Sequence, residues 1–176
     1  MSECVKVLRD ELPYNLHIFV NSVEFIAKVI DTLKLAPEAV KIVCSTSGDS
    51  RQENQRKLGN AYPIGQPSDP AKKINFYTST CFEGCDIFDP DGVTFIVSDG
   101  RKAHTLLDIS TLFTQICGRI RDSRYKTQIV HVYSTTKYSK AVTLDEFVAA
   151  TQRTLADAEK FASDINAVDE PSREKL

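Results

Sequence analysis

Short apolar runs alternate with helix-like stretches along most of the chain. Runs rich in β-branched and aromatic residues predict strands, and they lie at 16–20, 40–44, 74–77, 93–97 and 128–133. The stretches between and after them predict helices at 21–35, 50–58, 105–121 and 143–167. Continuous apolar strands that alternate with helices predict an α/β fold, with a parallel sheet of about five or more strands and helices on both faces.

Capping signals predict where several helices begin and end. Asn21 is followed three residues later by Glu24, and Thr143 by Glu146, which is the spacing of a capping box. Gly59 is placed to close the helix at 50–58. The last helix carries an apolar stripe that we expect to be buried, made of Leu144, Phe147, Val148, Thr151, Leu155, Ala158, Ala162 and Ile165.

The pattern predicts one domain with a segment on each side. Residues 1–13 show no clear period and are expected to be a connecting segment. The domain spans 14–167, with 143–167 as its long last helix, and the charged tail 168–176 is expected to be flexible. The proline-rich stretch 60–73 predicts an exposed, flexible loop.

Composition narrows the classes of function. The formal net charge of −2 gives no overall bias toward nucleic acid, so a nucleic-acid site must be a local patch. No apolar run approaches the length of a membrane span, so we expect no membrane partner. Because no signal-peptide pattern opens the chain, the five cysteines predict reduced thiols in a cytoplasmic protein.

Two segments carry candidate chemistry. Residues 78–87 read T-S-T-C-F-E-G-C-D-I and directly follow a predicted strand, whereas residues 115–121 read Q-I-C-G-R-I-R near the end of a predicted helix. In parallel sheets, ligands bind beyond the carboxyl ends of the strands, where the first segment lies. Arg119 and Arg121 are suited to phosphate, because guanidinium groups stay charged and bind its oxygens bidentately.

Each of these residues also has an ordinary structural explanation. Thr78 and Ser79 can be turn formers, and Gly84 can supply a positive φ. Asp86 can cap a turn, and Arg119 suits the carboxyl end of a helix. The order of the two patterns, T-S-x-x-x-E-G-x-D-I and then Q-x-x-G-R-x-R about thirty residues later, is more specific than any single residue.

In this order the two segments resemble motifs V and VI of superfamily 2 helicases, and Leu16–Ser22 resembles motif IV. Residues 14–135 therefore resemble the second, C-terminal RecA-like domain of such a helicase or translocase. The G-R-x-R pattern is similar to motif VI of viral and phage origin-binding helicases. The resemblance implies a RecA-like fold and ATP-driven movement on single-stranded DNA or RNA.

The resemblance also implies roles for single residues. Arg119 and Arg121 would reach across an interdomain cleft to the β- and γ-phosphates of ATP bound with Mg²⁺, and Gln115 would line that cleft. The other residues that it places near the nucleotide are Glu83, Gly84, Asp86 and Gly118. The residues that it turns toward the phosphate backbone of a single strand are Thr78, Ser79, Asn21 and Ser22.

The sequence departs from the helicase pattern in the spacing of its arginines and in the motifs that it lacks. Many members have the second arginine three places after the first, whereas Arg121 lies two and Arg124 five places after Arg119, so the identity of the arginine finger stays open. No G-x-x-x-x-G-K-[ST] occurs, and no D-E-x-[HD] follows an apolar strand. The chain is therefore not expected to hydrolyse ATP alone, and it needs an N-terminal RecA-like domain in cis or in trans.

Two other classes of function stay open. The chain could be a stand-alone α/β module that binds nucleic acid or protein without nucleotide dependence. A small-molecule α/β enzyme fits less well, because no convincing nucleophile or acid–base pair stands out. No metal site is expected, since Cys81 and Cys85 offer one ligand pair where zinc needs about four ligands.

Overall fold

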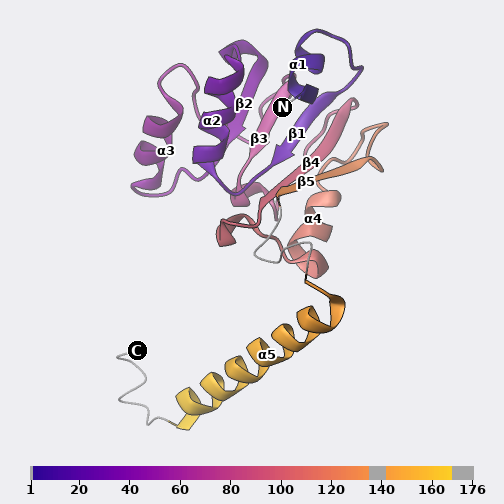
Figure 1. Ribbon diagram of the computed structural model, residues 1–176. Helices are drawn as coiled ribbons and strands as arrows, with labels where there is room; N and C mark the ends of the chain where they lie inside the picture. The colour runs from indigo at the N-terminus through magenta and orange to yellow at the C-terminus, as the bar shows by residue number, and fades with distance from the viewer. Residues whose placement is uncertain (1, 135–141, 168–176) are drawn as a thin grey trace. The chain divides into compact units, whose positions relative to one another are not determined.

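The structure is a computed structural model that describes residues 2–134 and 142–167 (Figure 1). Its centre is an open parallel sheet in the order β2-β3-β1-β4-β5. The strands are β1 (Asn15–Phe19), β2 (Val40–Val43), β3 (Ile74–Tyr77), β4 (Gly92–Asp99) and β5 (Ile129–Ser134). Each overlaps a strand predicted from the apolar runs, and the predicted fold class is confirmed.

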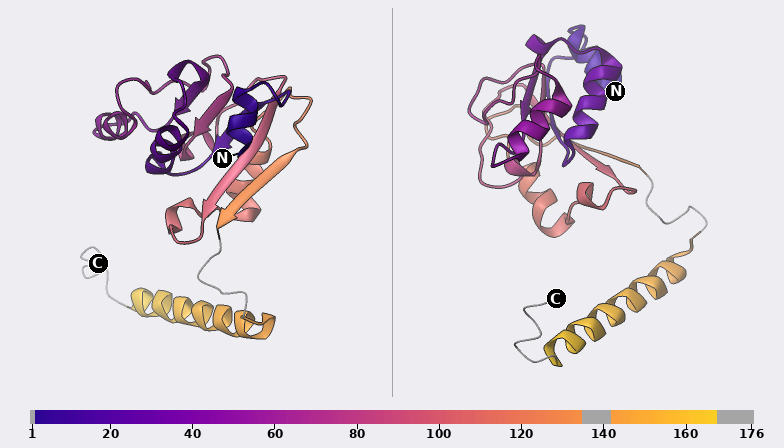
Figure 2. Two further views of the ribbon diagram at one scale, coloured as in Figure 1. Left: turned by 45° about the horizontal axis from the view of Figure 1, so that its top comes forward. Right: turned by 90° about the vertical axis from the view of Figure 1, so that its left-hand side faces the viewer.

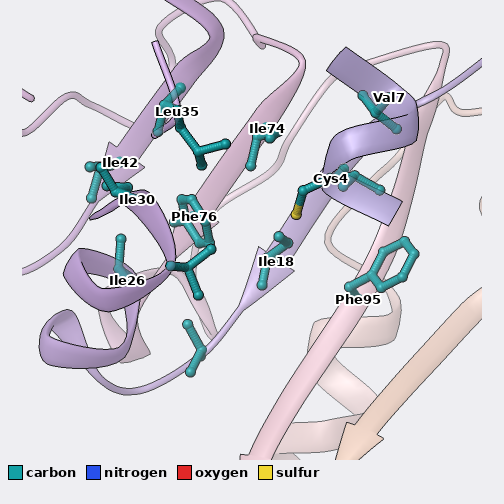
Figure 3. Close-up of a cluster of buried hydrophobic side chains, with 14 of the residues drawn as sticks. Cys4, Val7, Ile18, Ile26, Ile30, Leu35, Ile42, Ile74, Phe76 and Phe95 are labelled. Atoms are coloured by element: carbon teal, nitrogen blue, oxygen red, sulfur yellow. The ribbon is translucent and has the colours of Figure 1, made fainter. Parts of the chain in front are cut away.

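One face of the sheet packs against three helices, namely α1 (Ser2–Leu8), α2 (Val23–Leu33) and α3 (Ser50–Leu58). Alternate strand residues such as Ile18, Phe76 and Phe95 point into this core (Figure 3). They meet α2 residues such as Ile26 and Ile30, which recur at the helical spacing seen in the sequence. Because successive side chains of a strand point to opposite faces of the sheet, every second strand residue contributes to this core.

The opposite face is covered by α4 (Thr114–Cys117) and by the long connection from β3 to β4. In Figure 1, α1 and α2 lie on the viewer's side of the sheet and α4 lies behind it, and Figure 2 shows the same layers from two other directions. Phe19 and Tyr77 form the floor of this second core, and Phe82 and Ile116 cover them. Helices on both faces of a parallel sheet are consistent with a RecA-like fold.

The first residues are not a plain connecting segment, which corrects the prediction for 1–13. Residues Ser2–Leu8 form α1, and Cys4 and Val7 are buried in the first core. Two apolar positions three residues apart lie on one face of a helix. A helix of two turns is too short to show a clear period in the sequence, so tertiary packing decides its formation.

The single long helix predicted at 105–121 is also wrong. The structure has a 3₁₀ turn at Ala103–Thr105, a π-helical turn at Ile109–Phe113 and then the short α4. The side chain of Asp108 accepts hydrogen bonds from the N–H groups of Ser110 and Thr111 and so starts a new helical turn there. The apolar spacing therefore reflects burial of separate turns and not one continuous helix.

The helix ends agree with the capping signals in two cases out of three. Gly59 closes α3, with a φ of 84°, and Thr143 and Glu146 form the predicted capping box. The cap of α2 is Ser22 and not Asn21, because the Ser22 hydroxyl accepts from the N–H of Phe25 at 3.2 Å. Asn21 is thereby free for the contacts described below.

Contacts divide the chain into two compact units after Ser134, and the second contains α5 (Leu144–Ala167). Leu144, Phe147, Val148 and Leu155 of its apolar stripe are exposed, which differs from the predicted burial. Periodicity predicts a helix and its apolar face but not what covers that face. The side chains of Ala162 and Ile165, and the predicted tail 168–176, lie outside the described part of the chain.

No helix among the described residues is long and apolar enough to cross a membrane.

Candidate functional site

The two segments with candidate chemistry meet in space. Ile87 and Ile120 form an isolated parallel β-bridge, in which the Ile87 N–H donates to the Arg119 carbonyl at 2.9 Å and the Arg121 N–H donates to the Ile87 carbonyl at 3.0 Å. Both isoleucine side chains are buried in the second core. We call this contact, between residues 85–87 and 119–121, the arginine junction.

Pairing continues beyond the arginine junction toward the start of β4. The N–H of Asp89 donates to the Asp122 carboxylate at 2.9 Å, and the N–H of Arg124 donates to the Pro90 carbonyl at 3.0 Å. The buried Ser123 hydroxyl then donates to the Gly92 carbonyl at 2.6 Å. The chain after the second segment therefore runs beside the chain after the first and holds the junction in place.

The two arginines of the junction are held in different ways. Arg119 donates from Nε to the Gln115 carbonyl and from Nη1 to the Cys85 carbonyl, both at 3.0 Å. Arg121 pairs with Asp86 at 2.7 Å between Nε and Oδ1, and both side chains are 48% exposed. Arg119 thus bridges the two segments through main-chain oxygens, whereas Arg121 sits in a solvent-facing ion pair.

The other predicted nucleotide-side residues surround the junction. Glu83, Gly84, Gln115 and Gly118 are all exposed. Gly84 has a φ of +71°, so its conformation alone accounts for a glycine. Gly118 has a φ of −95°, and an added Cβ would lie 3.6 Å from the Gln115 carbonyl oxygen, an ordinary contact. The local backbone does not require glycine at 118, whereas close approach by a ligand would favour it.

The predicted strand-contacting residues gather where β1 and β3 end. Asn21 donates to the His104 carbonyl at 2.8 Å and accepts from the Ser79 N–H at 3.4 Å. It therefore ties together the loops that follow β1, β3 and β4. Ser79 is exposed and Asn21 is half-buried, whereas Ser22 and Thr78 are mostly buried. Asn21 and Ser79 are the accessible pair of this set.

Segment 78–87 joins the two groups of predicted residues. Its first residues lie beside Asn21, and its last residues form the arginine junction. A 3₁₀ turn at Ser79–Cys81 and the buried Phe82 anchor the part between them in the second core. Segment 78–87 therefore connects the carboxyl end of β3 to the arginine junction.

A buried polar network at the other end of the sheet was not found by sequence reasoning. Asp89 lies 2.8 Å from His17 Nε2 and accepts from the Asn15 amide at 3.0 Å, and His17 Nδ1 lies 3.1 Å from the Tyr77 hydroxyl. Burial works to raise the pKa of Asp89, but hydrogen bonds from His17 and Asn15 hold it below its ordinary value. No short spacing in the sequence signals a contact between residues 17 and 89.

The proline-rich loop is also held more firmly than its composition predicts. The buried Lys41 donates from Nζ to the Pro67 carbonyl at 2.9 Å, and Lys72 donates to the Val40 carbonyl at 2.9 Å. Burial lowers the pKa of Lys41 from its ordinary value. The loop and Asp86 line a small hollow of about 110 Å³ next to the arginine junction. The only feature of the sequence that indicated these lysine contacts was a lysine inside an apolar strand.

No protein-family model, curated protein or solved structure matches this chain. The function must therefore be inferred from the residues themselves and from the geometry that brings them together.

Proposed function

We propose that this chain is the C-terminal motor domain of an ATP-dependent DNA or RNA helicase or translocase. It would act with an N-terminal RecA-like domain, in cis or in trans. The observation that carries the proposal is the β-bridge between Ile87 and Ile120. It unites two distant segments whose patterns resemble helicase motifs V and VI, and it places two arginines beside residues proposed to lie near a nucleotide.

The arginine side chains are suited to the phosphates of ATP bound with Mg²⁺ on the partner domain. Arg121 would exchange its contact with Asp86 for phosphate oxygens. That release costs little, because exposed ion pairs contribute about 0–1 kcal/mol. Arg119 would keep one main-chain contact as a hinge and offer its remaining N–H groups. An arginine that completes such a site can contribute about 10³–10⁵ in rate.

Segment 78–87 would connect the proposed nucleotide site to the proposed nucleic-acid site. When Arg121 leaves Asp86 for a phosphate, it would release this end of segment 78–87, whose other end holds Ser79 beside Asn21. These two residues offer a hydroxyl, an amide and main-chain N–H groups to a strand's phosphates. Such contacts position a strand but carry no sequence information, so the proposal covers DNA and RNA alike.

One observation favours the alternative of a stand-alone binding module. Asn21, Ser79 and the residues that hold them all belong to this chain. The sequence, in contrast, contains no phosphate-binding loop for ATP. A module of this kind would bind a strand equally well with and without nucleotide. Nucleotide dependence of strand binding therefore separates the two functions.

The test uses the chain together with its proposed N-terminal RecA-like partner domain. Binding of fluorescein-labelled 20-mer oligothymidylate and oligouridylate is followed by anisotropy, with and without a non-hydrolysable ATP analogue. The motor proposal predicts an affinity that changes several-fold with the analogue. Equal affinities would support the binding module and contradict the motor, and no binding to either strand would contradict both.

A variant pair tests the strand-contacting edge. Asn21→Ala removes the side chain that ties three loops together, and we expect strand binding to weaken by about tenfold, as for loss of one or two hydrogen bonds. Asn54→Ala removes a comparable bond, from the Asn54 amide to the Ser45 carbonyl, that involves none of the contacts of Asn21 or Ser79. The control is expected to bind as the unmodified protein does. If both variants bind the strand equally well, Asn21 is not part of the strand-binding site.

A further inference from the structure

A cavity of about 460 Å³ opens beyond the carboxyl ends of β1 and β4. After β1 the chain crosses through α2 to β2 on one side of the sheet, and after β4 it crosses to β5 on the other side. Such a reversal separates neighbouring connections and leaves a crevice where α/β proteins bind ligands. Of the predicted site residues, only Ser22 lines it.

The cavity has an apolar floor and a charged rim. The floor residues are Val20, Phe25, Val29 and Val97. The charged residues at the rim are Glu24, Lys28, Asp99, Arg101 and Lys102. A surface of this kind suits a ligand with one planar or apolar part and one anionic part.

The rim charges leave one cation without a counter-charge. Lys102 pairs with Glu24 at 3.0 Å, and Arg101 pairs with Asp99 at 3.2 Å. Hydrogen bonds from Arg101 and Ser134 hold the pKa of Asp99 at about 2, so that ion pair persists at neutral pH. Within the described ranges, Lys28 has no hydrogen bond or ion pair with another residue. An anionic group at the rim would therefore meet Lys28.

We propose that this switch-point cavity receives one unstacked base of a single nucleic-acid strand, with an adjacent phosphate at Lys28. The inference rests on the proposed strand-binding function and adds to it a contact with a base. The strand-contacting Asn21 directly precedes Ser22, which lines the cavity. A strand whose phosphates lie along Asn21 and Ser79 thus has its next base within reach of the apolar floor. Bases of single strands leave their stack at low cost and gain by packing on protein side chains.

The volume and the floor also argue against other ligands. A cavity of about 460 Å³ holds a single nucleotide unit but not a protein segment of interface size. The mixed rim, with both acidic side chains already paired to cations, is unsuited to a metal ion, which needs several free oxygen, nitrogen or sulfur ligands.

The first test compares an intact 12-mer oligothymidylate with a 12-mer of the same backbone in which every base is absent. Both strands carry the same phosphates, so the ratio of their affinities reports base contacts. We expect the abasic strand to bind about tenfold more weakly, a typical effect of losing base packing. Val97→Phe would fill the cavity and bring the ratio close to one. Val130→Phe, at an exposed position on β5 outside the cavity lining, would leave the ratio unchanged.

The outcomes separate this inference from the proposed function. Equal affinities for the intact and abasic strands would overturn the base contact and leave strand binding standing. A ratio that Val97→Phe and Val130→Phe change equally would place the base contact elsewhere and also overturn the inference. Failure of the unmodified protein to bind the intact strand at all would overturn the strand-binding function and the inference together. Circular dichroism and urea unfolding confirm that both variants fold.

A salt titration tests the phosphate contact at Lys28. Each neutralised phosphate on a single strand contributes about −0.7 to the slope of log affinity against log salt concentration. Lys28→Ala is expected to make the slope less steep by about that amount. Lys126→Ala changes the net charge equally at an exposed position outside the cavity lining, and it is expected to keep the slope. The same slope in both variants would overturn the role of Lys28.

Discussion

Two polar contacts hold the last part of the connection from β3 to β4, and the two contacts differ in burial. At the arginine junction, Asp86 and Arg121 are each 48% exposed. At the start of β4, His17 and Asp89 are 0% and 5% exposed. Exposed ion pairs contribute about 0–1 kcal/mol, whereas removing one partner of a buried pair costs about 3–5 kcal/mol. The connection therefore has one fixed contact, at Asp89, and one exposed contact, at Asp86, whose charges can change partners.

This difference in burial determines which of the two contacts is accessible to a ligand. His17, Asp89 and Tyr77 satisfy one another's polar atoms inside the second core, so they anchor the chain and are closed to ligands. Arg121 can leave Asp86 without loss of the fold, because the main-chain bridge at Ile87 and Ile120 stays in place. A motor domain needs such a combination of a rigid frame and exchangeable charges.

The largest expected effect on stability comes from the fixed contact at Asp89. Asp89→Ala removes the acceptor shared by His17 and Asn15 and is expected to lower the free energy of unfolding by about 3–5 kcal/mol. Asp86→Ala, the matched change at the exposed contact, is expected to lower it by about 1 kcal/mol or less. Urea unfolding of both variants measures the difference. Similar losses in both variants would contradict the contrast between the two contacts.

A glycine substitution beside the same fixed contact has the next largest expected effect on stability. A Cβ added to Gly92 would lie 2.9 Å from ring atoms of His17, and that ring is buried and hydrogen-bonded. We expect Gly92→Ala to lower the free energy of unfolding by about 1–3 kcal/mol, as overpacking does. Gly118→Ala, at the junction, meets only ordinary contacts and is expected to stay within about 0.5 kcal/mol. Equal stability of the two variants would contradict the packing described for His17.

The smallest expected effect is a pH dependence specific to Asp89. Its pKa is lowered in the folded state, so the unfolded chain takes up the proton first as the pH falls. The stabilisation from Asp89 is therefore present above the ordinary value of about 3.9 and is lost as the pH falls through the lower folded value. Unfolding free energies measured between about pH 5 and pH 3 are expected to fall less steeply in Asp89→Asn than in the unmodified protein. Parallel curves would show that Asp89 does not titrate in this way.

The sequence predicted those parts of the fold that depend on local pattern. Continuous apolar runs located all five strands. In the largely buried strands β1 to β4 the reason is burial on both faces, which needs apolar side chains at successive positions. The edge strand β5 is largely exposed although its run is apolar. The capping box of Thr143 and Glu146 was also predictable, since its hydrogen bonds lie within four residues. For the site, the patterns at 78–87 and 115–121 indicated the two segments that the structure brings together.

The remaining features depend on tertiary contacts that no local pattern records. Ser22 and Asn21 are both good capping residues, and the choice of Ser22 follows from the bonds that Asn21 makes with His104 and Ser79. The contact of His17 with Asp89 spans 72 residues. The cavity near Lys28 exists only because β4 lies beside β1 in the sheet, and strand order is not encoded in hydrophobic periodicity.

The central claim is that the arginine side chains of the junction serve ATP turnover, and turnover by the complete motor tests it most directly. With the N-terminal RecA-like domain present, Arg119→Ala is expected to reduce ATP turnover by about 10³-fold or more while urea unfolding stays nearly unchanged. Arg121→Ala, measured beside it, shows whether that second arginine shares the role. Arg9→Ala removes an exposed arginine that follows α1 and is expected to keep full turnover. Normal ATP turnover in Arg119→Ala would contradict the account.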